Sequence, residues 1–430
     1  MSALVFLIVF IGLIAVRVPI SFALGVGGLA MAAAIPELDM MTTLTLFAQR
    51  VFVGIDVFLL LAIPLFILAG ALMEEGGAAS RLVGFASALV GRFRGGLGYV
   101  TVLSTMFFSG ISGSASADTA AVGSVMIPAM KRKGYHGPFS AVLTAGSGAL
   151  GPIIPPSVLL VIYGAMGNMS VAALFLGGFI PGIIIGISLM GLVFYQSRKY
   201  NYPREEAVGL RVVFDRFLQA ILALIIPLII LGGVFGGVFT ATESAAVAVA
   251  YAIFLGVFVY RELTWSQLPR IFYATGLLSA KVMFLIAVAT FIGFLFAHQR
   301  VPQMATDFLL TISREPWVVL LLVNILLLLI GCILEVAAAL IILGPVLIPV
   351  MQTIGVDPIH FGVVMVVNLA IGTVTPPVGN CLYIVSAISN ESIIRCSVAV
   401  VPVIAVMLGA LMVITYIPET VLFVPRLFGY

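Results

Sequence analysis

Four short segments of the 430-residue chain combine polar residues with residues that break helices. They are 109–118 (SGISGSASAD), 148–157 (GALGPIIPPS), 331–337 (GCILEVA) and 372–380 (GTVTPPVGN). A Pro-Pro pair ends a helix because proline lacks an N–H group and its ring clashes with the preceding turn. Each break leaves carbonyl oxygens that can bind a cation, and helix N-termini that favour an anion such as a carboxylate.

The neutral oxygens in these segments suit a hard monovalent cation and an organic anion. We predict Na⁺ ligands from Ser112, Gly113, Ser114, Gly151, Cys332, Gly372, Thr373, Thr375 and Gly379. Substrate contacts are predicted for Ser114, Ser116, Asp118, Ser157, Glu335 and Asn380. For any single serine or glycine the alternative is close helix packing, which is frequent in membranes.

Three acidic residues fall within or near apolar sequence, where a charge at the bilayer centre costs about 2.5–3.5 kcal/mol. Capping the second arm of a hairpin is the favoured role for Asp118, and Glu335 is expected to do likewise in the other half. For Glu243, which follows Thr240, capping and interfacial roles compete. No Lys or Arg falls at the predicted midplane, so the sequence offers no arginine clamp for a substrate.

The elements that position these segments are predicted to be membrane helices. Charged residues make up 9% of the chain and hydrophobic residues 62%, whereas soluble proteins carry about a quarter charged residues. In lipid, backbone groups must be satisfied within each segment, which favours helices. No Lys or Arg precedes the first apolar run, so we predict a helix there and no signal peptide. The predicted fold class is therefore an all-α polytopic membrane protein.

Apolar runs between breakers predict ten crossings. They are 3–16, 19–35, 57–74, 138–167 and 171–197 in the first half, and 214–234, 241–260, 279–297, 358–388 and 392–417 in the second. Segments 42–54 and 264–278 are predicted to lie in the interface. Residues 95–133 and 316–352 are predicted to form re-entrant hairpins, because each half-segment is too short to span. Crossings 138–167 and 358–388 are broken at their Pro-Pro pairs.

Basic residues support this topology. If the 131–133 loop is cytoplasmic, then all of the 20 Lys and Arg residues lie inside except Arg50, Arg300, Arg314 and Arg426. The same topology places the 131–137 and 198–211 loops in the cytoplasm, and the 300–314 loop outside. Both termini are predicted to be periplasmic.

The two halves of the chain repeat one another. Gly151 and Gly372, Pro155-Pro156 and Pro376-Pro377, and Pro181 and Pro402 are all separated by 221 residues. We predict one repeat in residues 1–210 and a second in 211–430. Each has an odd number of crossings, so the second is inverted relative to the first. Inverted repeats with broken helices at the midplane are typical of secondary transporters.

Other residues suggest weaker alternatives. Cys332, Cys381 and Cys396 lie in apolar stretches and are expected to pack rather than form disulfides. The G-x-S-G pattern at residues 110–113 matches intramembrane serine proteases, with Ser112 as nucleophile. All three histidines, His136, His298 and His360, are predicted at membrane edges, which argues against this chemistry.

Segments 110–119 (GISGSASADT), 126–135 (MIPAMKRKGY) and 151–157 (GPIIPPS) resemble the large membrane subunit of TRAP transporters, the tripartite ATP-independent periplasmic systems. The resemblance covers essentially the whole chain. It implies an elevator in which the hairpins and broken helices form a transport domain that slides against a scaffold of the other helices. It also implies Na⁺-driven uptake of an organic acid such as a C4-dicarboxylate, sialic acid, another sugar acid or a keto acid. The duplication suggests one Na⁺ site in each repeat, so two or more Na⁺ ions are expected, and no organic cofactor is expected.

The resemblance implies partners as well. A small four-helix membrane subunit is expected to brace the scaffold, as a separate polypeptide, and a periplasmic binding protein is expected to deliver the substrate. The expected location is the bacterial inner membrane, in contact with lipid and without nucleic acid. The alternative is a self-sufficient Na⁺/carboxylate symporter, which would transport without partners.

Overall fold

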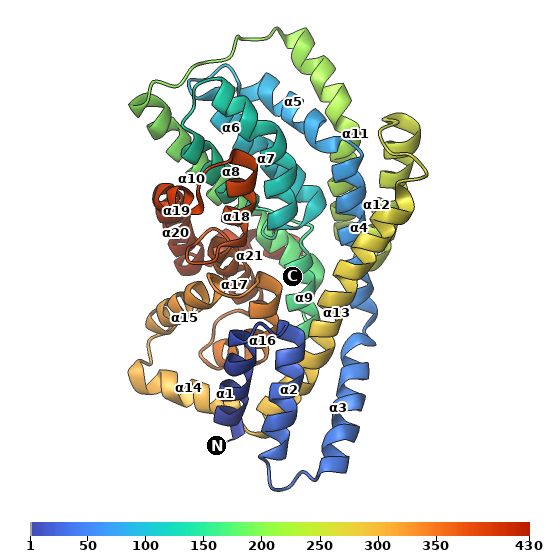
Figure 1. The fold of residues 1–430 in the computed structure, drawn as a ribbon, viewed down its shortest axis with the longest axis vertical. Helices are drawn as coiled ribbons and strands as arrows, with labels where there is room; N and C mark the ends of the chain where they lie inside the picture. Colours follow the sequence, from blue (N-terminus) through green and yellow to red (C-terminus); the bar gives the residue numbers. More distant parts are fainter. Residues whose placement is uncertain (1) are drawn as a thin grey trace.

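The computed structural model describes residues 2–430, and every regular element in that range is a helix (Figure 1). The helices of the first half are α1 (Ser2–Ala15), α2 (Ile20–Ala33), α3 (Met40–Ile55), η1 (Phe58–Leu61), α4 (Ala62–Glu75), α5 (Ala78–Val90), α6 (Gly96–Ser112), α7 (Ala115–Arg132), α8 (Gly137–Gly148), α9 (Val158–Gly167) and α10 (Val171–Lys199).

The second half has a matching succession of elements. Its helices are α11 (Leu210–Phe235), α12 (Ala241–Phe254), η2 (Leu255–Val259), α13 (Leu268–His298), α14 (Val301–Ile312), α15 (Pro316–Gly331), α16 (Val336–Thr353), α17 (Pro358–Gly372), α18 (Asn380–Ser389), α19 (Ile393–Ala399), α20 (Val401–Tyr416) and α21 (Glu419–Leu427).

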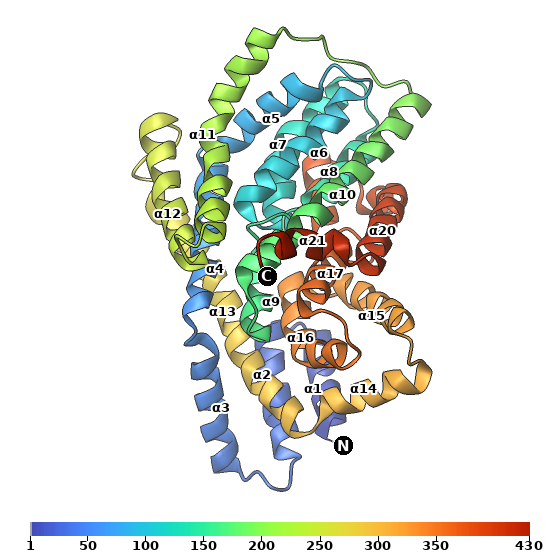
Figure 2. The same cartoon turned by 180° about the vertical axis from the view of Figure 1, so that it is seen from behind.

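Both predicted hairpins and both broken crossings are present, so the fold is an all-α membrane architecture of two inverted repeats. The hairpins are α6–α7 and α15–α16, and the broken helices are α8–α9 and α17–α18. Figures 1 and 2 place the first hairpin in the upper half of the view and the second in the lower half. Six helices of residues 2–430 are long and apolar enough to span a membrane, or up to eight if each bent pair counts as one span.

One predicted element is wrong. Segment 264–278 is not a separate interfacial helix, because residues 268–298 form the single 31-residue helix α13. Two glycines, Gly276 and Gly293, follow Pro269 in this helix, and each glycine costs a helix about 1 kcal/mol without ending it. Tertiary packing along α2, α3 and α4 offsets that cost.

Three helices were absent from the predicted set: α5, α14 and α21. All three are amphipathic, and their polar faces interrupt the apolar runs on which the prediction relied. Helices α5 and α14 hold corresponding places in the two repeats, directly before a hairpin. Helix α14 turns by 117° into α15, so this pair is not one straight span.

The two repeats interlock around their breaks. Helix α7 of the first hairpin packs against α18 of the second broken helix, and α16 of the second hairpin packs against α9 of the first. Each hairpin therefore supports a half-helix of the other repeat, which brings all four breaks to the middle of the molecule.

Candidate substrate and ion site

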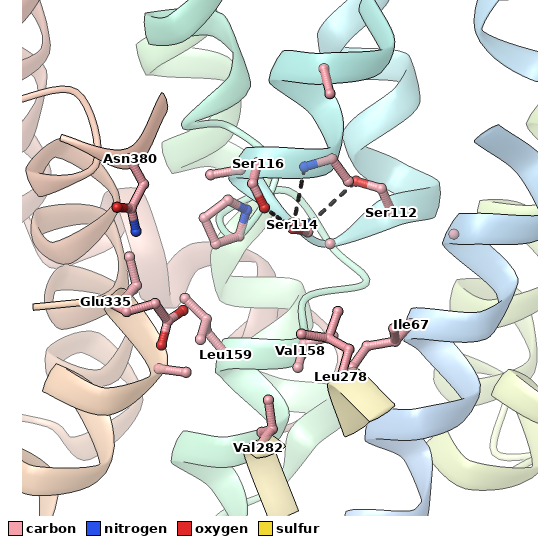
Figure 3. A pocket seen from close by; sticks show the side chains of 18 of the residues that line it. Ile67, Ser112, Ser114, Ser116, Val158, Leu159, Leu278, Val282, Glu335 and Asn380 are labelled. Atoms are coloured by element: carbon pink, nitrogen blue, oxygen red, sulfur yellow. Dashed lines mark hydrogen bonds between the residues drawn. The ribbon is translucent and has the colours of Figure 1, made fainter. Parts of the chain in front are cut away.

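A cavity of about 600 Å³ lies where the four breaks face helices α4 and α13 (Figure 3). One wall consists of the tip of the first hairpin, the start of α9, the tip of the second hairpin and the start of α18. The opposite wall includes Ile67, Gly70 and Glu74 of α4, and Thr275 and Leu278 of α13. The cavity thus separates the broken elements from two unbroken helices.

The first hairpin tip is held by a chain of hydrogen bonds. Gly113 ends α6 with φ +61°, a left-handed conformation that glycine adopts without strain. The N–H of Ser114 donates to the hydroxyl of Ser112 at 3.2 Å, and the Ser112 hydroxyl donates to Asp118. A second hydroxyl, that of Ser109, also donates to Asp118. The tip therefore depends on one buried carboxylate.

The predicted capping role of Asp118 is wrong. The N-cap of α7 is Ser114, whose hydroxyl accepts the N–H of Ala117 at 3.5 Å, while Asp118 lies one turn into the helix. Its side chain is fully buried and faces the other arm of the hairpin, where both serine donors lie. A carboxylate that accepts two hydroxyl donors is satisfied there, and it has no free helix N–H to cap.

The second hairpin tip uses a carboxylate as its cap, as predicted. Glu335 precedes α16 and accepts the N–H of Ala338 through Oε2 at 3.2 Å. Glu335 lies 221 residues after Ser114, so equivalent positions cap the two hairpins with different groups. Glu243 also caps a helix: with Thr240 it forms a capping box at the start of α12.

Glycines bring each tip against the break in its own repeat. A Cβ at Gly151 would lie 2.7 Å from the carbonyl oxygen of Ser114, and one at Gly372 would lie 2.5 Å from the carbonyl carbon of Gly331. In the second repeat, the N–H of Val378 also donates to the carbonyl of Cys332 at 3.3 Å. Only glycine allows these approaches, because the Cβ of any other residue would overlap with backbone atoms of the hairpin tip.

The two broken helices restart differently. Ser157 caps α9, accepting the N–H of Leu160 at 3.3 Å and donating to the carbonyl of Pro152. Helix α18 has no side-chain cap and begins at Asn380, which lines the cavity. Ser157 and Val378 occupy equivalent repeat positions, which explains why only the first restart has a hydroxyl cap.

Carbonyl oxygens gather at the second break. Around Gly379, which has φ +51°, the carbonyl oxygens of Thr375 and Thr373 lie 3.1 and 3.3 Å from the position of a Cβ. The Thr375 hydroxyl donates to Ile371 at 2.8 Å, which leaves its lone pairs available to a cation. Oxygens of this kind and density can coordinate Na⁺ where helices are unwound.

The cavity lining is acidic. Among residues 2–430, Glu74 and Glu335 are the only charged residues that line it, and no Lys, Arg or His of that range does so. Because no basic side chain of the described residues lines the cavity, an anion there would be bound by helix N-termini, hydroxyls and an amide. Figure 3 shows Ser114, Ser116 and Asn380 above Glu335 in this space.

The cavity brings together about half of the predicted site residues. Those that line it are Ser112, Gly113, Ser114, Ser116, Glu335, Thr373 and Asn380. Asp118, Gly151, Ser157, Cys332, Gly372, Thr375 and Gly379 do not line it; they lie in the same tips and breaks, behind the lining. No histidine lines the cavity beside Ser112, as a serine protease would require.

Sequence reasoning missed the wall made by α4 and α13. Residues Ile67, Ala71, Leu278 and Val282 line the cavity but look like ordinary membrane-facing positions. Glu74 was the one available signal, since an acid at the end of an apolar helix is unusual. Cys381 also lines the cavity, beside the Thr373 hydroxyl, at 3.5 Å.

Residues 7–420 match the family model described as "Tripartite ATP-independent periplasmic transporter, DctM component". Among curated proteins, the chain is 37% identical to the C4-dicarboxylate TRAP transporter large permease protein DctM of Rhodobacter capsulatus, over 100% of both chains. It is 40% identical to the sialic acid TRAP transporter large permease protein SiaM of Vibrio cholerae, over 98% of both.

Solved structures share the fold at low sequence identity. The YdaH transporter of Alcanivorax borkumensis superposes with a TM-score of 0.64 at 13% identity, covering 88% of this chain and 89% of that one. MtrF of Neisseria gonorrhoeae gives a TM-score of 0.59 at 13% identity, covering 87% and 83%. At such identities the likeness concerns architecture alone.

Proposed function

This chain belongs to the DctM component family of tripartite ATP-independent periplasmic transporters, and from that membership we propose Na⁺-driven uptake of a small organic acid by an elevator mechanism. It is a multi-span permease of the bacterial inner membrane and not an enzyme. The observation that carries the proposal is the cavity where all four helix breaks face two unbroken helices.

The substrate carboxylate binds, in this proposal, between the N-termini of α7 and α18. Helix α16 is less suitable because the Glu335 carboxylate already occupies its N-terminus. By contrast, α7 has the neutral cap Ser114, and α18 has no side-chain cap. The hydroxyls of Ser114 and Ser116, which lie 3.2 Å apart, and the amide of Asn380 would then hydrogen-bond the carboxylate. Asp118 and Ser157 support this site from behind.

Two Na⁺ sites are proposed, one in each repeat. The first is formed by Ser112, Gly113, Ser114 and Gly151, where the Ser114 carbonyl and the Asp118 carboxylate converge. The second is formed by Cys332, Gly372, Thr373, Thr375 and Gly379. Bound cations would also offset the negative charge of the acidic cavity, so an anion would bind better once Na⁺ is present.

The cavity marks the boundary between the proposed moving and fixed parts. Hairpins α6–α7 and α15–α16 with the broken helices α8–α9 and α17–α18 form the transport domain. Helices α4 and α13, on the opposite wall, belong to the scaffold with the remaining membrane helices. Amphipathic helices α5 and α14 join the two parts at equivalent positions in the repeats, 1–210 and 211–430. The charge distribution leads us to propose periplasmic termini.

A small four-helix membrane subunit and a periplasmic binding protein are the proposed partners. Family membership supports both, since these systems are tripartite. The proposed substrates are carboxylates such as sialic acid or a C4-dicarboxylate, the substrates named for two relatives. Uptake by the purified chain alone would favour the self-sufficient symporter instead.

Replacing external Na⁺ by K⁺ should abolish uptake of the organic acid in proteoliposomes that contain the assembled transporter. The reason is that the proposed sites of carbonyl and hydroxyl oxygens would hold Na⁺ as the coupling ion, and its charge would favour binding of the carboxylate. If two or more Na⁺ accompany one monocarboxylate, an inside-negative potential of 100 mV adds about 2.3 kcal/mol per net charge. Uptake should be independent of ATP, and equal rates in Na⁺ and K⁺ would refute the proposed coupling.

Thr375→Val should raise the Na⁺ concentration for half-maximal uptake by roughly five- to 150-fold, because an unmatched coordinating group costs about 1–3 kcal/mol. Valine keeps the shape of threonine and removes the one hydroxyl, which donates to Ile371. The matched control is Ile154→Thr, the equivalent repeat position, which should leave Na⁺ affinity nearly unchanged. Sodium titrations of uptake for both variants decide whether Thr375 is a ligand or only packs.

A further inference from the structure

A second recess, of about 480 Å³, lies away from the cavity at the C-terminal end of α10. It is lined by Arg94, Phe194, Ser197, Arg198 and Arg204. Arg198 belongs to the last turn of α10. Arg94 belongs to the loop between α5 and α6, residues 91–95, and Arg204 belongs to the loop after α10, residues 200–209. Neither the transport cavity nor the proposed Na⁺ sites include any of these residues.

The backbone around this recess is fixed. The N–H of Gly95 donates to Pro203 at 3.1 Å, and the N–H of Glu205 donates to Gly91 at 3.2 Å, so the two loops are hydrogen-bonded to each other. Gly95 has φ +78°, and a Cβ there would lie 2.5 Å from that of Ser197, so the first loop rests directly on α10. The recess is thus a built feature and not a gap between mobile loops.

Tyr202 anchors the second loop. Its ring stacks on Tyr135 with centroids 4.2 Å apart, and its hydroxyl hydrogen-bonds His136 at 2.8 Å. Because Arg204 follows two residues later, its backbone is held close to the arginines of the first loop and of α10.

The recess has three positive charges and no negative one. No ion pair within residues 2–430 includes Arg94, Arg198 or Arg204. The nearby Glu205 lies 3.3 Å from Lys133 instead, and Arg198 lies over the ring of Phe194, 4.1 Å from its centroid. Like charges gathered in this way repel one another unless an anion binds between them, and guanidinium groups suit phosphate oxygens in particular.

Exposed apolar residues lead from the membrane to the recess. Ile183, Ile187 and Phe194 of α10 are 44%, 61% and 50% exposed, and Tyr195 is 62% exposed. Aliphatic residues followed by aromatic and then basic residues mark a helix that leaves the bilayer through the headgroup layer. We propose that this recess binds the phosphate headgroup of an anionic phospholipid, with its acyl chains along the exposed face of α10.

Such a lipid would stabilise α10 and the 91–95 loop, which position the first break and the first hairpin. Helix α10 packs against that break, because a Cβ at Gly178 would lie 2.5 Å from the carbonyl of Ile153. The 91–95 loop leads directly into α6 of the first hairpin. Basic pockets between membrane helices on the cytoplasmic side commonly bind anionic headgroups, and the charge distribution predicts that side for this recess.

The test compares phosphatidylglycerol, phosphatidylcholine and inorganic phosphate as ligands of the purified full-length chain in neutral detergent. We expect phosphatidylglycerol to bind and to raise the melting temperature, and the other two to do neither at the same concentration. The triple variant Arg94→Gln, Arg198→Gln, Arg204→Gln should bind phosphatidylglycerol at least tenfold more weakly. The control with the same charge change, Arg132→Gln, Arg211→Gln, Arg216→Gln, should stay within twofold of the wild type.

The corresponding Arg→Lys triple keeps the charge but loses the planar donors, so we expect intermediate binding. It also serves as the folded variant if the glutamine triple fails to fold. Equal lipid binding by the recess and control variants would overturn the proposal. Equal affinity of the recess for inorganic phosphate and for phosphatidylglycerol would also overturn it, because the recess would then be a site for a free anion.

Discussion

Gly372→Ala should reduce uptake at least tenfold although it adds a single methyl group. The new Cβ would lie 2.5 Å from the carbonyl carbon of Gly331, 2.6 Å from its oxygen and 2.8 Å from its Cα. These are backbone atoms of the second hairpin tip, which cannot turn aside as a flexible side chain can. Overpacking costs about 1–3 kcal/mol, and a clash with the Gly331 backbone lies at or above that range. We expect uptake to fall at least tenfold.

Helix propensity alone predicts that Gly372→Ala would stabilise the protein. Gly372 is the last residue of α17, and alanine is favoured over glycine in helices by about 1 kcal/mol. Gly232→Ala is the matched control, because this helical glycine of α11 has nothing within 4 Å of its missing Cβ. Gly331→Ala should be intermediate, since its Cβ would meet the Leu369 side chain at 3.2 Å.

The measurement is Na⁺-driven uptake per amount of reconstituted protein, with melting temperatures for all three variants. A transport defect confined to Gly372→Ala, with melting above the assay temperature, would show that the tip must seat against the break for transport. Equal uptake by Gly372→Ala and Gly232→Ala would contradict the tight docking of hairpin and break.

Most of the fold that could be predicted from the sequence was predicted from the positions of glycine and proline. The Pro-Pro pairs mark the breaks that follow α8, which ends at Gly148, and α17, which ends at Gly372, and the bounds of both hairpins follow from the polar tips between apolar runs. Segment 264–278 is mixed in character, which is typical of an interfacial helix, whereas packing along α13 makes one helix of residues 268–298. Local pattern cannot supply that tertiary contribution.

The site could be predicted only on the side that breaks the helical pattern. Ser114 and Asn380 stand out because each polar residue follows a glycine, and Glu335 stands out because an acid is rare in membrane sequence. Leu278 and Val282 do not stand out, since a cavity-facing leucine is identical in sequence to a lipid-facing one. Asp118 shows a third limit: its type and position suit an N-cap, and only the fold reveals the two serines on the opposite arm.

Asp118→Ala should reduce uptake by roughly 10- to 100-fold, equivalent to about 1.4–2.8 kcal/mol. The variant removes the acceptor for the hydroxyls of Ser109 and Ser112, and leaving buried donors unsatisfied costs about 1–3 kcal/mol. It also frees the Ser112 hydroxyl that accepts the N–H of Ser114, so the whole turn of the hairpin tip loses its support. The cavity wall that presents Ser114 would then lose its geometry.

A double-mutant cycle tests whether this network is the cause. If Asp118 acts by accepting the Ser112 hydroxyl, the double variant Asp118→Ala, Ser112→Ala should be no worse than Asp118→Ala alone. Strictly additive losses in uptake would mean that the two residues act independently, which the hydrogen bond between them makes unexpected. Glu37→Ala, an exposed acid of the α2–α3 loop, controls for the loss of a carboxylate elsewhere.

Sodium dependence separates support of the tip from ion binding at Asp118. The carboxylate lies beside Gly151 and the Ser114 carbonyl, so it is placed to contribute to the first Na⁺ site. Asp118→Asn keeps the volume and one acceptor oxygen but removes the negative charge. If the charge attracts Na⁺, this variant should raise the Na⁺ concentration for half-maximal uptake several-fold and leave the maximal rate nearly intact. If Asp118 only supports the tip, the maximal rate should fall at unchanged Na⁺ affinity, because a carboxamide cannot accept both serine hydroxyls as the carboxylate does.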